Sequence, residues 1–156
     1  MGIGQILKGH DLFGLLSVED MNLVSGFSSV KTLSAGESIF QFNALSTHVY
    51  VLMKGSVHLR LPSDDPDVSF LVHKLKTGEF FGLAPLLGQD RYTTTAYCTS
   101  AVQVLAIEAE PFRELLQHDY AVGYQVMREA ARIYYSRYLG VIRSLQGVIS
   151  QIPLER

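Results

Sequence analysis

The sequence has a single cysteine, no tryptophan and no long apolar stretch. One cysteine, Cys98, excludes a disulfide framework and any metal or iron–sulfur site built from several cysteines of one chain. No apolar run approaches the roughly 20 residues that span a bilayer. The N-terminus also lacks the cationic start and apolar stretch of a secretion signal. We therefore expect a cytoplasmic protein with no membrane partner.

A strong charge of one sign is missing as well. The formal net charge is −2, and nothing in that balance requires a nucleic-acid partner. Histidines occur without any His-x-His spacing, so the sequence predicts no metal site; they are His10, His48, His58, His73 and His118. No nucleophile motif such as Gly-x-Ser-x-Gly occurs. We expect a protein that is not an enzyme.

What the chain does have is enough apolar residues for one compact domain, residues 1–156. They make up 47% of its 156 residues. Residues 1–30 show apolar side chains at helical spacing, and Ser17 followed by Asp20 is typical of a helix start. Residues 110–156 predict a short helix and then a long helix from about Ala121 to Ile152. The domain therefore begins and ends with helices.

The middle section, residues 31–109, is typical of short strands separated by turns. Apolar or alternating runs recur along it, at 38–40, 49–53, 57–61, 70–75, 93–97 and 102–107. Many short strands at regular spacing indicate an antiparallel sandwich or barrel.

Five short motifs follow one another along the chain. They are Asp11–Phe13 with Ser17–Met21, Leu33–Phe40 with its Gly-Glu turn, Val49–Leu52, Lys54–Val57 and Gly78–Gly82. Their order and separations resemble the cyclic nucleotide-binding domains, a family of catabolite activator protein-like sensors, over nearly the whole chain. The resemblance implies an α+β, mainly β fold. Its centre is an antiparallel double-stranded β-helix, a jelly-roll-like β roll, flanked by N-terminal helices and a long C-terminal helix.

The segment from Gly78 to Ala96 resembles the phosphate-binding cassette of this family. In typical members, amides of a short helix bind the phosphate, an arginine opening the next strand neutralises it, and an acid after the cassette glycine binds the ribose. The resemblance implies a cyclic nucleotide, cAMP or cGMP, with tyrosines of the long helix near the purine. The predicted ligand-binding residues are Phe81, Gly82, Leu83, Ala84, Arg91, Tyr92, Thr93, Tyr134 and Tyr138.

Three positions depart from the family's pattern. Leu83 stands where the ribose-binding acid is expected, and Pro85 has no N–H to donate to a phosphate. Counting forward from the cassette places Arg91 at the arginine position, whereas counting back from residues 102–107 places Tyr92 there. In a strand, a slip of one residue turns a side chain to the other face. Both registers stay open at this point.

Two interpretations of function follow. In the first, the domain is a non-catalytic sensor in which a cyclic nucleotide or a different small ligand moves the long helix against the roll. In the second, the pocket is vestigial and the long helix serves as a structural element. The family often dimerises through this helix, so we expect a homodimer. We interpret its arginines as a solvated face or as intersubunit pairs; they are Arg128, Arg132, Arg137 and Arg143. The chain as given carries no helix-turn-helix, so we expect no nucleic-acid partner within it.

Overall fold

A computed structural model describes residues 2–10 and 13–153 of the chain. Asp11 and Leu12, which belong to the first predicted motif, lie outside the described residues. Three short helices come first: α1 (Ile3–Lys8), η1 (Phe13–Leu15) and α2 (Val18–Gly26). The predicted start of α2 is confirmed, because the Ser17 hydroxyl oxygen accepts a hydrogen bond from the Asp20 N–H at 3.0 Å.

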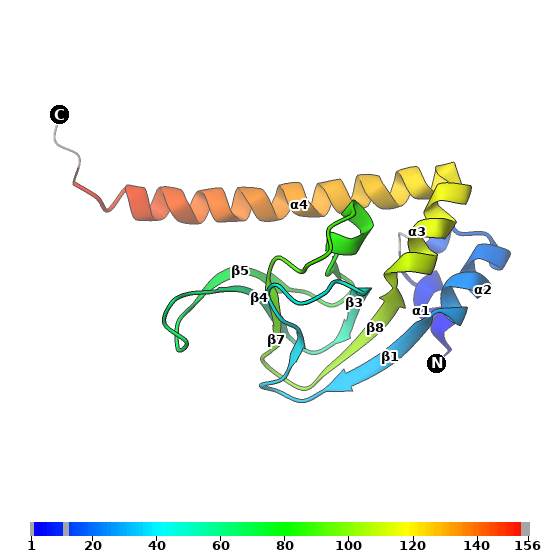
Figure 1. The fold of residues 1–156 in the computed structure, drawn as a ribbon, viewed down its shortest axis with the longest axis horizontal. Helices are drawn as coiled ribbons and strands as arrows, with labels where there is room; N and C mark the ends of the chain where they lie inside the picture. The colour runs from blue at the N-terminus through cyan, green and yellow to red at the C-terminus, as the bar shows by residue number, and fades with distance from the viewer. Residues whose placement is uncertain (1, 11–12, 154–156) are drawn as a thin grey trace.

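The strands form a β roll of two four-stranded antiparallel sheets (Figure 1). The first sheet has the order β1–β8–β3–β6, with bounds Ser28–Leu33, Val102–Glu108, His48–Lys54 and Phe80–Phe81. The second has the order β2–β7–β4–β5, with bounds Ser38–Phe40, Thr95–Cys98, Val57–Pro62 and Ser69–Leu75. The predicted fold class is therefore confirmed.

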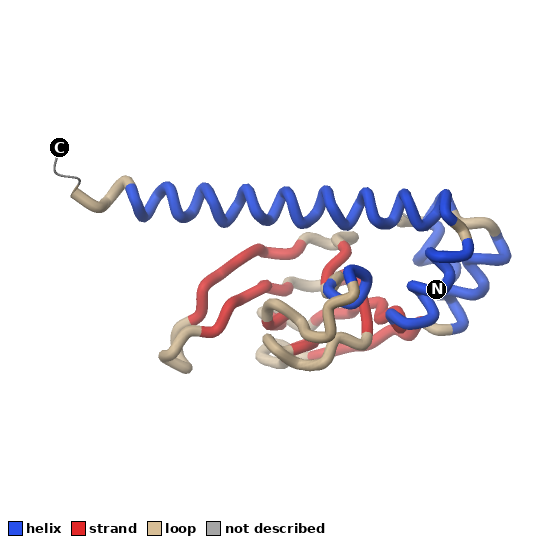
Figure 2. Tube along the Cα trace, turned by 45° about the horizontal axis from the view of Figure 1, so that its top comes forward, coloured by secondary structure: helices blue, strands red, loops and turns tan. Residues whose placement is uncertain are grey.

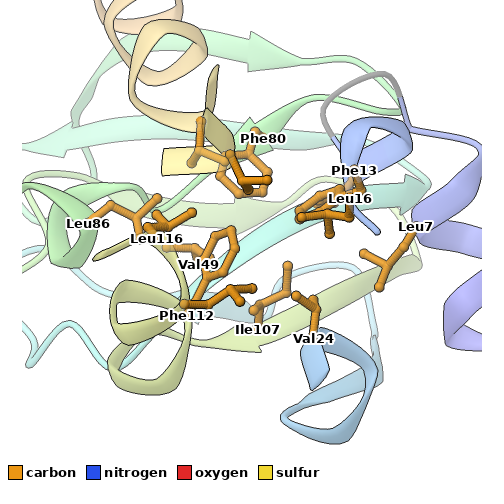
Figure 3. Close-up of a cluster of buried hydrophobic side chains, with 14 of the residues drawn as sticks. Leu7, Phe13, Leu16, Val24, Val49, Phe80, Leu86, Ile107, Phe112 and Leu116 are labelled. Carbon is orange, nitrogen blue, oxygen red and sulfur yellow. The ribbon is translucent and has the colours of Figure 1, made fainter. Parts of the chain in front are cut away.

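Side chains of the central strand β3 alternate between two hydrophobic cores. Val49 and Val51 point into the core under the helices, whereas Tyr50 and Leu52 point into the interior of the roll. Successive residues of a strand face opposite sides, and both sides of β3 are covered. Figure 3 shows the core under the helices, where Val49 lies with Phe112 of the C-terminal helices. A strand buried on both faces explains why this stretch of sequence is continuously apolar.

The C-terminal part of the chain consists of α3 (Ala109–His118) and α4 (Tyr120–Ile149). Asp119 caps α4, since its Oδ1 accepts a hydrogen bond from the Val122 N–H at 3.2 Å. The two helices meet closely at Gly123, where an added Cβ would lie 2.3 Å from the Leu116 carbonyl oxygen. The start of α4 is therefore held tightly against α3.

Beyond this junction, α4 runs in one piece over the β roll (Figures 1 and 2). Its first turns contribute Val122, Val126 and Ala130 to the core under the helices. Its last turns leave Leu145 and Val148 exposed. In the part of the chain that the structure describes, no helix is both long enough and apolar enough to cross a membrane.

Candidate ligand-binding site

The cassette keeps the predicted backbone course. After β6 the chain turns at Gly82, makes the short helix η2 (Ala84–Leu87), and turns again at Gly88. Gly82 has a φ of 66°, which favours glycine. A Cβ there would lie 3.0 Å from the rings of both Phe40 and Tyr50. Glycine is thus needed both for the turn and for the close approach of two aromatic rings.

A pocket of about 250 Å³ lies between this cassette and α4. Its volume is just below the roughly 300–1,000 Å³ common for small-molecule sites. Most of the residues predicted to bind a ligand line it, namely Gly82, Leu83, Ala84, Tyr92, Thr93, Tyr134 and Tyr138. Sequence reasoning missed six further lining residues, which are Phe40, Leu59, Val72, Thr94, Arg137 and Val141.

Two predicted site residues, Arg91 and Phe81, do not line the pocket. Arg91 is exposed, and its Nη1 donates a hydrogen bond to the Asn43 carbonyl at 3.0 Å. Its backbone pairs with Leu45 in an isolated antiparallel bridge. Phe81 is fully buried in the roll interior, stacked on Tyr50 with 5.5 Å between ring centroids. The structure therefore gives neither side chain access to a ligand in this pocket.

Tyr92 lines the pocket and Arg91 does not, which is the arrangement expected from the register counted back from residues 102–107. Its ring stacks on Phe40 with 3.9 Å between centroids and 16° between planes. Its hydroxyl donates to the His48 carbonyl at 2.6 Å and accepts from the His48 N–H at 3.1 Å. The phenol is thus occupied by the protein's own backbone, and what Tyr92 offers the pocket is an aromatic surface.

Arg137 of α4 is the one charged residue among those found to line the pocket. Its Nη2 donates a hydrogen bond to the Phe80 carbonyl at 2.8 Å. Its Nε is buried and has no hydrogen-bond partner among the described residues. Burial lowers the pKa of the guanidinium, and the nearby carboxylate of Glu79 opposes that effect. Burial raises the pKa of the Tyr134 phenol, and the positive charge of Arg137 partly opposes that rise.

A wider polar groove lies on the other side of Arg137. Its lining includes His73, Glu79, Arg128 and Arg132. The carboxylate of Glu79 is engaged there, because its Oε2 lies 2.8 Å from His73 Nε2. Arg137 therefore separates an apolar pocket from a charged groove. Within residues 2–10 and 13–153, no three His, Cys, Asp or Glu side chains gather so as to hold a metal ion.

The sequence of the β roll and α3 shows which family the chain belongs to. Residues 30–119 match the family model described as the cyclic nucleotide-binding domain. The chain belongs to this family. The predicted resemblance is thereby confirmed, and the pocket of this cyclic nucleotide-binding domain lies where its cassette meets α4.

Solved structures share the fold of this cyclic nucleotide-binding domain. A "Putative Cyclic nucleotide-binding protein" from Geobacter metallireducens GS-15 is 25% identical, with a TM-score of 0.76 over 88% of this chain and 99% of that one. The sensor domain of the transcriptional regulator DNR from Pseudomonas aeruginosa is 18% identical, with a TM-score of 0.73 over 86% of this chain and 94% of that one. The second likeness shows the fold alone.

Two curated relatives come from Drosophila melanogaster. The cAMP-dependent protein kinase type II regulatory subunit is 29% identical over 106 residues, which are 67% of this chain and 27% of that subunit. A cGMP-dependent protein kinase, isozyme 2 forms cD5/T2, is 26% identical over 114 residues, which are 72% of this chain and 12% of the kinase. The chain thus spans between about an eighth and about a quarter of these relatives' lengths.

Proposed function

We propose that this domain is a non-catalytic sensor in which a small molecule in the pocket changes how α4 lies against the β roll. Its relatives include a regulatory subunit and the sensor domain of a transcriptional regulator, which supports a regulatory role. The single observation that carries the proposal is that the β roll and α4 each provide one wall of the pocket.

One wall of the pocket belongs to the roll and the other to α4. The roll provides the cassette residues Gly82–Ala84 together with Tyr92, and α4 provides Tyr134, Arg137 and Tyr138. Any occupant therefore touches both bodies at once. A ligand shifts a conformational equilibrium when its affinity differs between the two states. When α4 moves away from the β roll, a ligand in this pocket loses its contacts with one wall, so its affinity differs between the two positions of α4.

The test measures the distance between α4 and β5 without needing a known ligand. Spin labels on Ser144→Cys in α4 and Lys74→Cys in β5 report that distance by pulsed electron paramagnetic resonance, since both positions are exposed. The native Cys98 is buried and does not compete for the label. We expect Val141→Trp, which fills the pocket, to shift the distance distribution. The matched substitution Ser136→Trp lies outside the pocket and is expected to leave the distance distribution unchanged. Identical distributions in the doubly labelled parent protein and in both tryptophan variants would contradict the sensor model.

For the cyclic nucleotides themselves we expect weak binding at best. Arg91 lies outside the pocket, and Leu83 replaces the acid that would accept a ribose hydroxyl. Losing a partner for a buried polar group costs about 1–3 kcal/mol. Isothermal titration calorimetry with cAMP and cGMP is expected to give no saturable heat below millimolar concentration. Micromolar binding that is lost in Arg91→Ala would show instead that the cassette works in the usual way.

A second function, dimerisation through α4, is favoured by one specific observation. Large apolar side chains are exposed on one face of the last turns of α4, outside the pocket, at spacings of three and four residues; they are Leu145, Val148 and Ile149. Leu145 and Val148 are 47% and 59% exposed. We expect a homodimer in analytical ultracentrifugation that Leu145→Glu dissociates, whereas Arg143→Glu on the neighbouring face leaves it intact. A monomer at high protein concentration would exclude this function.

A further inference from the structure

Arg137 forms no ion pair with any residue of the ranges 2–10 and 13–153. Glu79 acts on it electrostatically but forms its own contact with His73. A largely buried charge without a partner is costly. An anion in the pocket would supply the missing partner.

The geometry of Arg137 favours a carboxylate as that anion. Its Nη2 donates one hydrogen bond to the Phe80 carbonyl, and the other Nη N–H groups have no acceptor among the described residues. The Nε–H is enclosed by the protein, so these Nη groups are the ones left for a ligand. Adjacent N–H groups of a guanidinium match the two oxygens of a carboxylate in a bidentate pair. One cation also balances one negative charge, so a monoanion suits the site.

The rest of the pocket selects an apolar body. Phe40 and Tyr92 provide stacked rings, and Leu59, Val72 and Leu83 provide aliphatic surface. Besides Arg137, the polar side-chain groups of the lining are the hydroxyls of threonine and tyrosine, at Thr93, Thr94, Tyr134 and Tyr138. The phenol of Tyr92 is engaged by His48. A ribose would leave hydroxyl groups unpaired against Leu83, which is costly. An aromatic ring or a branched hydrocarbon meets no such penalty.

From these observations we propose that the pocket binds a small monocarboxylate with an aryl or branched aliphatic body, held by Arg137 at its acid and by the apolar walls at its body. This rests on the proposed sensor function and names its ligand class. The volume of about 250 Å³ restricts the ligand to the size range of benzoate, phenylacetate or cyclohexanecarboxylate.

The test is a titration of the ¹⁵N-labelled protein, followed by nuclear magnetic resonance, with phenylacetate and with its neutral analogue phenylacetamide. We expect saturable shifts with phenylacetate, centred on Gly82–Ala84 and Thr93, and affinity weaker by about ten- to a hundredfold for the amide, the range for hydrogen bonds to a charged group. Arg137→Met should reduce phenylacetate affinity by a similar factor while leaving that of the amide unchanged.

Matched controls separate the pocket from its surroundings. Arg143→Met makes the same change on the exposed face of α4 and should leave phenylacetate affinity unchanged. Arg128→Met removes a cation from the polar groove only, so a loss of affinity there would place the carboxylate in the groove and overturn the proposal. Val141→Trp fills the pocket with Arg137 retained, and should abolish binding even if Arg137→Met disturbs the docking of α4.

The outcomes also separate the ligand class from the sensor function. Arg137-dependent binding without any change in the α4–β5 distance would support the ligand class and contradict the sensor. A distance change produced by a cyclic nucleotide, with no carboxylate binding, would overturn the ligand class and leave the sensor standing. Equal affinity for phenylacetate and phenylacetamide would overturn the role given to Arg137.

Discussion

The two walls of the pocket differ in how far their polar groups are already engaged. On the roll side, the phenol of Tyr92 is bonded to His48 and the guanidinium of Arg91 is turned outward onto Asn43. On the helix side, Arg137 lines the pocket, and its buried Nε has no hydrogen-bond partner among the described residues. The roll wall therefore contributes mainly packing, and the α4 wall is the one to which we assign recognition of a ligand. The family's fold survives here because packing maintains it, while the charge available to a ligand comes from a different element.

The strongest test of this contrast deletes one aromatic ring from each wall. Phe40 is 7% exposed and packs on Tyr50, Phe81 and Tyr92, whereas Tyr138 is 60% exposed. We expect Phe40→Ala to lower the free energy of unfolding by about 3–5 kcal/mol and Tyr138→Ala by less than about 1 kcal/mol. Urea denaturation measures both. Equal losses would show that the two walls are alike in their contribution to the fold.

A smaller effect is expected from removing one hydroxyl on the roll side. Tyr92→Phe keeps the stacked ring but leaves the His48 backbone N–H and carbonyl without their partner. We expect a loss of about 1–3 kcal/mol of stability. Tyr97→Phe is the control, since this tyrosine lies in β7 with its ring under the Arg60 guanidinium, and it should change stability little. No loss in Tyr92→Phe would mean that the hydroxyl is free to meet a ligand.

The burial of Tyr50 in the β roll should also make the stability of the protein depend on pH in the alkaline range. Burial, with a further contribution from the phenol of Tyr92, raises the pKa of Tyr50 above its ordinary value. The folded state thus favours the neutral phenol, so the corresponding stability is present below the unfolded pKa of about 10 and is lost as pH rises above it. We expect Tyr50→Phe to flatten the fall of melting temperature above that pH. Tyr124→Phe, at an exposed position on α4, should not.

The smallest effect is expected at Arg91, the residue that the sequence motif singles out. Its side chain is exposed and makes one hydrogen bond to a backbone carbonyl. Arg91→Ala should change the free energy of unfolding by less than about 0.5 kcal/mol and should leave phenylacetate binding unchanged. A clear loss of binding in this variant would return recognition to the cassette.

The fold was predictable because it follows from local patterns. Continuous apolar runs mark β3 and β8, alternating or mixed apolar runs mark β4 and β5, and a serine cap marks α2. The strand β1 carries no such pattern, since its middle four residues are exposed and its pairing with β8 supplies the structure instead. That contact joins segments far apart in the chain, which sequence periodicity does not report.

The site was predictable only in part. The cassette turn and the tyrosines of α4 reach the pocket as expected. The position of Arg91 could not be read from the sequence, because its backbone pairs with Leu45, a residue far away in the chain. Arg137 resembled a solvated arginine in sequence, although its spacing from the apolar Ile133, Tyr134 and Val141 places it on the buried face of the helix. An arginine within an apolar helical stripe was the available signal.

The tight junction at Gly123 has a mechanical consequence. Because an added Cβ would collide with the Leu116 carbonyl there, the backbones of α3 and α4 are in close contact at this end of α4. In the sensor proposed above, this contact would be the pivot about which α4 swings. At 1.5 Å per residue, Arg137 lies about 21 Å from Gly123 and Ile149 about 39 Å. A swing that displaces the helix at the pocket would therefore displace its far end nearly twice as much.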